Sequence, residues 1–246
     1  MIPKQIHQEF IGFDIPHKNL DEFPVFVSQQ KKTMKHCQEY GIDYKLWSEK
    51  DCNELLKTKY PHYEEFYNSM RYGVQKADFI RYLILYEYGG LYIDLDVCPI
   101  ENIRDVFSQD VYFVKWDNCK KNLPYNAILG SSPKHKIFKD IIDHCIESYK
   151  EKETMEIYDD WVGRFVFQTT GHFMVQRVLK KYPFVGRWNV LRIHTKEGTI
   201  VEGHYPLFED YSVSSWYVDH HRTGSQAGIK KKPTSQYFFF PSTNAL

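Results

Sequence analysis

The sequence predicts an α/β protein in which one domain carries helical insertions. Short apolar runs with strand character alternate with longer amphipathic stretches along most of the 246 residues, and this alternation is typical of a sheet covered by helices. The chain has no internal repeat and no low-complexity linker that would mark a domain boundary. A chain of this length buries enough surface to fold without disulfide or metal support. We therefore expect a single domain over residues 1–246.

The first third of the chain is predicted to alternate strands and helices. Pro24 is acceptable in the first turn of a helix, where its missing N–H would have no partner. Ser48 precedes a helical stretch, with Asp51 three residues later, which is the spacing of a capping box. The predicted strands are Pro3–Gly12 and Tyr44–Ser48, and the predicted helices are Glu22–Cys37, Glu49–Lys57 and His62–Met70.

The next segment reads as a helix followed at once by a strand. The helix Val74–Tyr88 is expected to end at Gly89-Gly90, because glycine readily adopts the positive φ that terminates helices. The strand Leu91–Val97 follows, and Pro99 closes it. Further strands are predicted at Val111–Trp116, Ala127–Gly130 and Val190–His194, and further helices at Lys134–Lys150 and Gly171–Lys181.

Composition and charge exclude several classes of protein. Lys and Arg (32) balance Asp and Glu (32), which argues against a nucleic-acid partner because phosphate binding needs clustered positive charge. The five cysteines lack the spacing of a disulfide framework or a zinc site, so we expect reduced thiols. The N-terminus has no apolar leader, and the longest apolar run, Phe79–Tyr88, is charged and short. We expect a cytoplasmic protein without stable membrane insertion.

Two carboxylates mark the predicted strand Leu91–Val97. Its odd-numbered positions are all apolar, whereas Tyr92, Asp94 and Asp96 alternate with them and should share the other face. Carboxylates so placed repel each other unless a positive charge lies between them. A hard divalent cation, Mg²⁺ or Mn²⁺, takes such oxygen ligands. The alternative is a solvated strand end with no ligand.

Asp78 and Arg81 lie three residues apart in the helix Val74–Tyr88, which is apolar almost all round and should be buried. Ionised groups in a buried helix must be paired or must face a binding site. Taken alone, the pair is most simply explained as a salt bridge between helix neighbours.

The segment that contains these residues resembles a known family. Residues 76–97, KADFIRYLILYEYGGLYIDLDV, resemble the sugar-binding region of the DXD glycosyltransferases of family 32, which include the yeast initiating mannosyltransferase. The arrangement is also similar to the core of the clostridial glucosylating toxins. IPKQIHQEFIG resembles the family's first strand, and His220–Ser225 resembles its His-His-x-x-Gly-Ser-Trp ending, with Gln226 in place of the final Trp.

The resemblance implies a fold of the GT-A type, a Rossmann-like mixed sheet flanked by helices. It places the donor-binding core at about residues 1–132 and the metal and acceptor region at about 133–246. Near the middle of the second region, Thr170-Gly171-His172 stands where the family has Thr-Gly-Pro.

The resemblance also implies a set of catalytic and metal-binding residues. Asp94 and Asp96 would hold Mn²⁺ or Mg²⁺ on the donor diphosphate, Asp96 more directly. His221 would be a third metal ligand, with His220 as the competing choice, and Ser225 would reach the leaving phosphate.

The donor itself would be bound by four further residues. By resemblance, Asp78 and Arg81 would hydrogen-bond the sugar hydroxyls, which explains buried charges better than a salt bridge does. Tyr92 would line the pocket. Phe10 would stack on the nucleotide base, at a position where the family usually has Trp.

The implied activity is a metal-dependent, retaining transfer of a hexose. The donor would be a UDP-hexose or GDP-mannose, the acceptor a hydroxyl of a glycan, and the location the cytoplasm (of the host, if the protein is viral). One alternative is a phosphohydrolase of the haloacid-dehalogenase type with Asp94 as nucleophile. Another is a non-catalytic carbohydrate-binding protein that uses its aromatic side chains for stacking.

Overall fold

The main sheet of the protein is mixed, as the sequence predicts. The computed structural model describes residues 1–11, 19–116, 123–152, 162–182, 191–195, 198–201 and 207–210. Five strands lie in the order β2-β1-β3-β6-β5. Strand β1 is parallel to β2 and β3, whereas β6 is antiparallel to β3 and β5. The strands are β1 (Gln5–Phe10), β2 (Asp43–Ser48), β3 (Gly90–Ile93), β5 (Val111–Trp116) and β6 (Leu123–Ser131).

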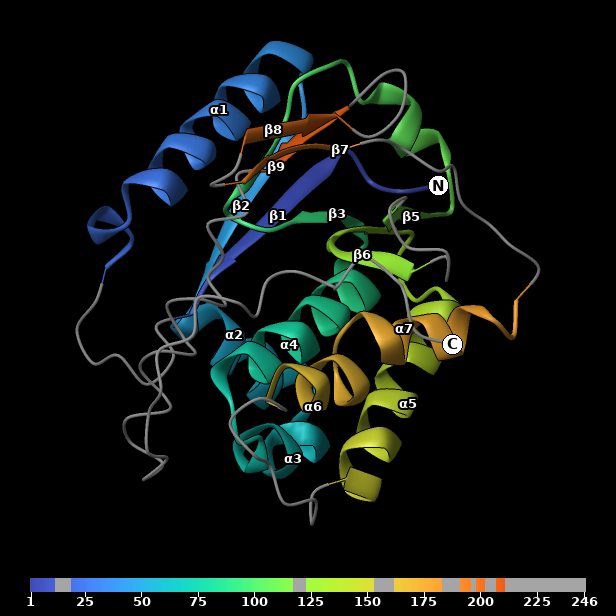
Figure 1. The fold of residues 1–246 in the computed structure, drawn as a ribbon. Helices are drawn as coiled ribbons and strands as arrows, with labels where there is room; N and C mark the ends of the chain where they lie inside the picture. The colour runs from blue at the N-terminus through green and yellow to red at the C-terminus, as the bar shows by residue number, and fades with distance from the viewer. Residues whose placement is uncertain are drawn as a thin grey trace.

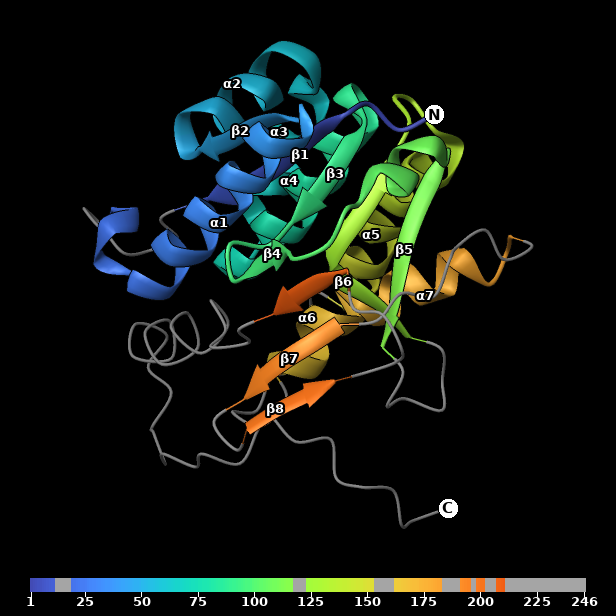
Figure 2. The same ribbon diagram turned by 90° about the horizontal axis from the view of Figure 1, so that it is seen from above.

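Helices cover both faces of this sheet (Figures 1 and 2). On one face lies α1 (Pro24–Tyr40), and on the other lie α2 to α7. Those on the second face are α2 (Glu49–Lys59), α3 (Glu64–Ser69), α4 (Gly73–Tyr88), α5 (Lys136–Lys152), α6 (Val162–Thr169) and α7 (His172–Leu179). Short 3₁₀ turns are found at Leu20–Glu22, Pro61–Tyr63 and Arg104–Ser108.

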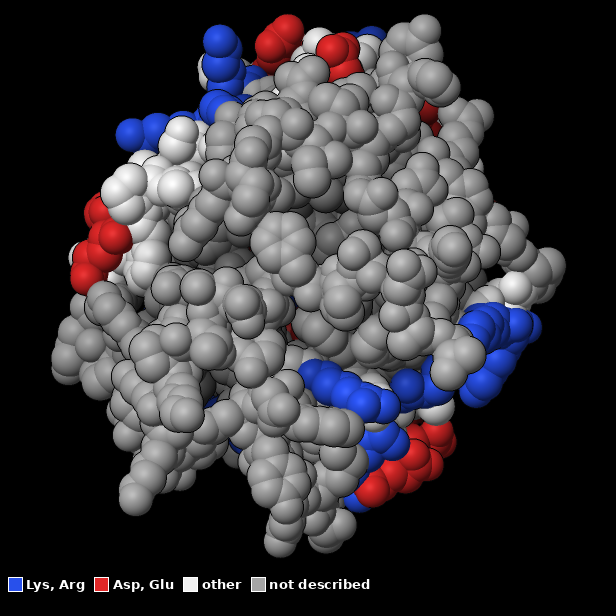
Figure 3. Space-filling view, viewed as in Figure 1, with Lys and Arg blue, Asp and Glu red and all other residues white. Residues whose placement is uncertain are grey.

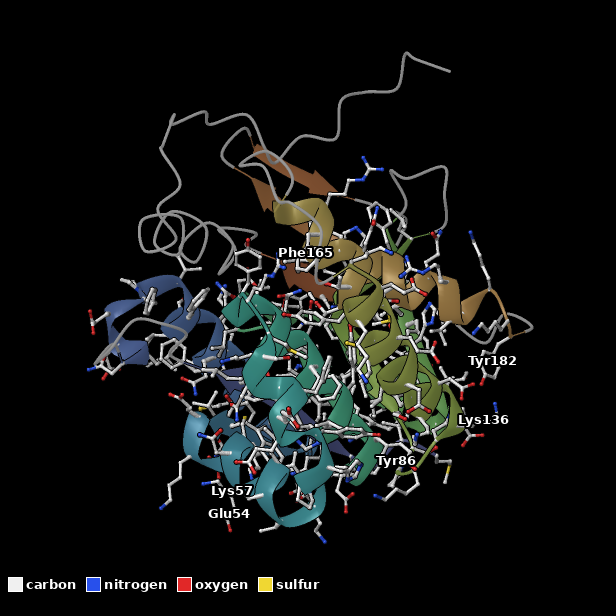
Figure 4. The ribbon with its side chains drawn as sticks, turned by 90° about the horizontal axis from the view of Figure 1, so that it is seen from below. Glu54, Lys57, Tyr86, Lys136, Phe165 and Tyr182 are labelled. Atoms are coloured by element: carbon white, nitrogen blue, oxygen red, sulfur yellow. The ribbon has the colours of Figure 1, made fainter. Side chains whose placement is uncertain are left out.

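Two hydrophobic cores result from this layering. The larger core lies between the sheet and helices α2 to α7, and α4 runs through it with nearly every residue buried. Phe165 lies on α6 (Figure 4). It is 1% exposed and packs edge-on against Tyr72 and obliquely against Tyr149. The smaller core lies on the α1 face of the sheet. Tyr92 belongs to the larger core and Leu91 and Ile93 to the smaller one, which confirms the alternation predicted for this strand.

A second, four-stranded sheet adjoins the first in the order β4-β9-β7-β8. Its strands are β4 (Val97–Pro99), β7 (Leu191–Thr195), β8 (Gly198–Val201) and β9 (Phe208–Asp210). Phe208 is fully buried in the smaller core. The second sheet is therefore packed on the same interior as the first.

The prediction of one continuous strand over Leu91–Val97 is wrong. Strand β3 ends at Ile93, and residues 94–96 form a turn closed by a 3.0 Å hydrogen bond from the Val97 amide to the Asp94 carbonyl. Strand β4 then pairs with β9 in the other sheet. The apolar alternation persists through the turn because Leu95 is also buried, so the period-2 pattern conceals the change of sheet. Asp96 therefore does not share a strand face with Tyr92.

The junction between α4 and β3 requires both of its glycines. Gly89 has a φ of 69° and Gly90 a φ of 92°, values that residues other than glycine rarely adopt. A Cβ atom at Gly89 would lie 2.7 Å from the Ser131 carbonyl, and one at Gly90 2.7 Å from His7 Nε2. The predicted helix end is confirmed, and the close packing holds β3 against β1 and β6.

Other local predictions are confirmed with small shifts. The capping box of Ser48 and Asp51 is formed, and Pro24 is the first residue of α1. The helix expected over His62–Met70 is a 3₁₀ turn followed by α3. Helix α6 has no counterpart among the predicted elements.

Four of the five cysteines, Cys37, Cys52, Cys98 and Cys145, are buried free thiols, and Cys119 lies outside the described residues. No helix within the described segments has both the length and the apolar character needed to cross a bilayer. On the face seen in Figure 3, described side chains of both charge signs lie along the edge.

Candidate active site

Arg81 is the centre of a buried charge cluster beneath the carboxyl ends of β1 and β3. It projects from α4 and is 6% exposed. Its Nη1 lies 3.0 Å from Asp94 Oδ1, and its Nη2 lies 3.3 Å from Glu9 Oε1 and 3.7 Å from Asp78 Oδ1. The guanidinium also stands over the Tyr92 ring, 4.5 Å from its centroid. One cation is thus surrounded by three carboxyl groups and an aromatic face.

Backbone carbonyls occupy the remaining donors of Arg81. Nε donates to the Ala77 carbonyl at 3.3 Å, and Nη1 donates to the Asn126 carbonyl at 3.0 Å. Each of the three guanidinium nitrogens therefore has a partner inside the protein. The contact with Asp78, expected from helix spacing, is the longest of the three contacts between Arg81 and a carboxyl group.

Asp78 is fixed by partners from two distant elements. Asn126 Nδ2 of β6 donates to its Oδ1 at 2.7 Å, and Thr170 Oγ1, just after α6, donates to its Oδ2 at 2.8 Å. Burial raises the pKa of Asp78 to about 6, against the lowering effect of Arg81. Tyr82 connects the same partners, since its hydroxyl lies 2.9 Å from Asn126 Oδ1 and 2.6 Å from the Thr170 carbonyl.

Tyr92 connects the carboxyl groups of Glu9 and Asp94. Its hydroxyl oxygen lies 2.9 Å from Glu9 Oε1 and 2.7 Å from Asp94 Oδ1. A phenol has one proton to donate, so both contacts are hydrogen bonds only if one of the two carboxyl groups carries a proton. The geometry favours Glu9 as the protonated partner, because Glu9 is the more buried of the two acids.

The charge state of Glu9 agrees with this geometry. Burial raises its pKa to about 8, in spite of the opposing effect of Arg81. At neutral pH Glu9 is therefore mostly uncharged. Its second oxygen, Oε2, is buried and has no hydrogen-bond partner among the described residues.

The turn that contains Asp94 and Asp96 is held by the main sheet. The Asp94 amide continues the ladder to β6 by donating to the Ala127 carbonyl at 2.9 Å. Gln8 Nε2, from β1, donates to the Asp94 carbonyl at 3.1 Å. The side chain of Asp94 is 25% exposed, whereas Asp96 is buried at 7% exposure.

The chemistry of this turn fits a hard cation in part. Two carboxylates separated by one residue supply the oxygen ligands that Mn²⁺ and Mg²⁺ prefer. However, the described segments contain no group of three or more His, Cys, Asp or Glu side chains arranged to hold a metal ion. Further ligands would have to come from a bound substrate or from the rest of the chain. His220, His221 and Ser225 lie outside the described residues.

Phe10 lies at the same sheet edge but on the opposite face. It alternates with Glu9 along β1, and its ring packs against Phe23, with ring centroids 5.7 Å apart. The structure thus brings together Asp78, Arg81, Tyr92 and Asp94, and it places Phe10 on the α1 side of the sheet.

Sequence reasoning missed three members of the cluster: Glu9, Asn126 and Thr170. A signal was available for Glu9, because a charged residue within the predicted strand Pro3–Gly12 needs a partner or a function if that strand is buried. Asn126 carries no comparable signal. Thr170 belongs to the segment that stands where the family has Thr-Gly-Pro, but the resemblance assigns it no place at the donor site. Their roles depend on contacts 48 and 92 residues away along the chain.

Comparison with known proteins identifies the region that contains most of this cluster. Residues 24–113 match the family described as the glycosyltransferase sugar-binding region containing a DXD motif. This confirms the family resemblance seen in the sequence. The matched region includes Asp78, Arg81 and Asp94, whereas Glu9, Asn126 and Thr170 lie outside it.

Two yeast relatives and one solved structure are similar to the chain over most of its length. A mannosyl phosphorylinositol ceramide synthase of Saccharomyces cerevisiae is 28% identical over 89% of this chain and 53% of the relative. An inositol phosphoceramide mannosyltransferase of Schizosaccharomyces pombe is 26% identical over 88% of this chain and 56% of the relative. The chain thus spans just over half the length of these relatives.

The solved structure of the PaToxG glycosyltransferase shares the fold. It aligns with a TM-score of 0.53 and 15% identity, covering 73% of this chain and 68% of the other. The predicted fold class, a mixed sheet flanked by helices as in GT-A glycosyltransferases, is confirmed.

Proposed function

We propose that the chain, whose residues 24–113 match the sugar-binding region of the DXD glycosyltransferases, transfers a hexose from a nucleotide diphosphate sugar to a hydroxyl acceptor with retention of configuration. The observation that carries this proposal is the cluster around Arg81. Carboxyl groups gathered at the carboxyl edge of parallel strands lie where open α/β sheets bind ligands. Their oxygens suit the hydroxyls of a sugar.

The described residues have distinct roles in the proposed complex. Asp78 and Arg81 face the sugar hydroxyls, and Asn126 and Thr170 keep the Asp78 carboxylate in one orientation. Tyr92 lines the pocket, and Phe10 stacks on the nucleotide base from the other side of β1. Because Asp78, Arg81 and Tyr92 are already fixed by hydrogen bonds, they bind without the cost of ordering flexible groups.

A divalent cation, Mn²⁺ or Mg²⁺, is part of the proposal. Asp94 and Asp96 would hold it, with His221 or His220 as a third ligand, and Ser225 would contact the leaving phosphate. When bound, the cation supplies positive charge that stabilises the departing diphosphate. Arg81 and Tyr92 hold the Asp94 carboxylate in place for this role.

The names of the relatives suggest which substrates to test first. Both describe mannosyl transfer in the formation of an inositol-containing ceramide lipid. We therefore place GDP-mannose ahead of UDP-hexoses as donor. As acceptor we add the hydroxyl of an inositol phosphate group to the glycan hydroxyl. A cytoplasmic location remains a prediction from the sequence.

A thermal-shift panel tests the proposal. GDP-mannose, UDP-glucose, GDP and UDP are each added with Mn²⁺ or with EDTA to the wild type, to Asp96→Ala and to the surface control Asp143→Ala on α5. A ligand at about a hundred times its Kd should stabilise the protein by about 2.7 kcal/mol. We expect one nucleotide to raise the Tm of the wild type and control with Mn²⁺, and to lose this effect in Asp96→Ala.

The alternatives give different results in the same samples. If no nucleotide raises the Tm but the protein hydrolyses p-nitrophenyl phosphate, the phosphohydrolase is correct. If a sugar binds and no donor is hydrolysed or transferred with Mn²⁺, the protein is a carbohydrate-binding module. The family match and the shared fold favour the transferase over both.

A further inference from the structure

Glu9 occupies a special place in the sheet, at the carboxyl end of β1 next to the turn that contains Asp94. In the parallel pair of β1 and β3, His7 is the register partner of Tyr92. Two residues further along each strand, Glu9 and Asp94 therefore stand side by side and face α4. The carboxyl group of Glu9 is thus the counterpart of Asp94 on the neighbouring strand.

The two oxygens of Glu9 differ in how they are used. Oε1 contacts Tyr92 Oη at 2.9 Å and Arg81 Nη2 at 3.3 Å. Oε2 has no partner among the described residues although the side chain is only 4% exposed. An unpaired buried polar atom costs on the order of 1–3 kcal/mol, and such atoms are uncommon in native interiors.

The chemistry of Oε2 follows from the single proton of the phenol. If Tyr92 donates to Asp94, the proton between Tyr92 and Glu9 belongs to Glu9 Oε1. Oε2 is then the carbonyl oxygen of a neutral carboxylic acid and lacks a donor. The missing partner is an O–H or N–H group.

We propose that Glu9 is a specificity-determining residue whose Oε2 accepts a hydrogen bond from one hydroxyl of the donor's hexose. This inference rests on the proposed function and adds a contact from β1, which lies outside the matched family region at residues 24–113. No other polar atom of the described Arg81 cluster is buried without a partner. A sugar hydroxyl here would complete the hydrogen bonding of the cluster.

A purely structural role for Glu9 is the competing explanation. In that case its carboxyl group only supports Arg81 and Tyr92. Its loss would then weaken the binding of the parent donor and of every deoxy analogue by the same factor. A direct contact has a narrower effect, because it concerns a single hydroxyl. The two explanations are separated by combining a protein variant with a ligand that lacks one hydroxyl.

The experiment compares the wild type with Glu9→Met, which removes both oxygens at similar volume. With Mn²⁺ present, calorimetry measures the Kd of GDP, GDP-mannose and its 2-, 3-, 4- and 6-deoxy analogues (or the UDP-glucose series, if the thermal-shift panel selects UDP). In the wild type we expect the deoxy analogue that lacks the hydroxyl bound by Glu9 to bind about tenfold more weakly than the parent donor, as a lost hydrogen bond implies; other analogues can also bind more weakly, but only this one should depend on Glu9. In Glu9→Met that analogue and the parent should bind equally, and GDP should bind as it does to the wild type.

The controls keep the inference open to refutation. Glu87→Met, at the C-terminal end of α4, should leave every ratio unchanged. If Glu9→Met fails to fold, Glu9→Ala removes the same oxygens and the same ratios apply. If every deoxy analogue keeps its wild-type ratio to the parent in the variant, the contact is absent and the inference is wrong, while the proposed function stands. If the wild type binds neither nucleotide series, the proposed function itself fails.

Discussion

The middle and the C-terminal end of helix α4 carry charged groups that are organised in opposite ways. Near its middle, Arg81 is surrounded by the carboxyl groups of Glu9, Asp78 and Asp94. At its C-terminal end, the single carboxylate of Glu87 is bound by Lys134, by Lys59 at 3.8 Å and by the Tyr60 hydroxyl at 2.6 Å. The first group has more acids than cations, and the second has more cations than acids.

The acid–base properties of the two groups differ accordingly. Burial dominates at Glu9 and raises its pKa to about 8. At Glu87 burial also acts to raise the pKa, but the hydrogen bonds from Lys134 and Tyr60 hold it below its ordinary value. A cluster with more acids than cations and an unpaired buried oxygen is not arranged for stability alone. Such an arrangement is typical of binding sites. The Glu87 group stabilises the fold and needs no ligand.

The largest effect should come from removing the cation of the first group. Arg81→Met leaves three carboxyl groups in the interior without their shared partner. Breaking a buried ion pair in this way costs about 3–5 kcal/mol, and urea unfolding at pH 7 measures this loss. A loss below about 1 kcal/mol, the value typical of a surface pair, would show that Arg81 does not hold the cluster together.

A smaller effect, with a definite sign, concerns pH. Between the ordinary pKa of 4.5 and the folded value of about 8, folded Glu9 binds more protons than unfolded Glu9, so its contribution to stability falls as pH rises. The unfolding free energy of Glu9→Gln minus that of the wild type should therefore increase by on the order of a few kcal/mol between pH 5 and pH 8. Urea unfolding at each pH measures the difference.

Glu87→Gln gives the opposite sign when the urea assay is extended below pH 4.5. Folded Glu87 binds fewer protons than unfolded Glu87, so the wild-type advantage is present above pH 4.5 and disappears as pH falls below it. If the two variants changed with pH in the same direction, the contrast between the Arg81 group and the Glu87 group would be refuted.

The smallest effect is expected at the exposed side of the second group. Lys134 is 51% exposed, and exposed ion pairs contribute roughly 0–1 kcal/mol. Lys134→Met should lower the unfolding free energy by less than about 1 kcal/mol, and 1 M NaCl should reduce the difference further by screening. Urea unfolding with and without the salt tests both points, and a loss comparable to that of Arg81→Met would contradict them.

The sequence was informative where structure depends on neighbouring residues. The capping box of Ser48, the helix end at Gly89 and the burial of α4 were predicted because each depends on spacing within a few positions. Asp78, Arg81 and Asp94 were assigned to one site from a family pattern confined to 22 consecutive residues, 76–97.

Features that depend on distant contacts were not predictable from one sequence. The break after Ile93 depends on the pairing of β4 with β9 in the second sheet, and a buried Leu95 keeps the apolar alternation intact across the turn. Glu9 and Thr170 meet the α4 residues over 72 and 92 positions. A local pattern contains no information about such partners.

The change of sheet at the Asp-Leu-Asp turn has a mechanical consequence. The residue before the turn, Ile93, is hydrogen-bonded within one sheet, and the residue after it, Val97, within the other. The two carboxylates therefore lie in the connection between the two sheets. A ligand that binds both of them would restrict the motion of one sheet relative to the other. Because β4 pairs with β9, this restriction would extend to a strand from the far end of the described chain.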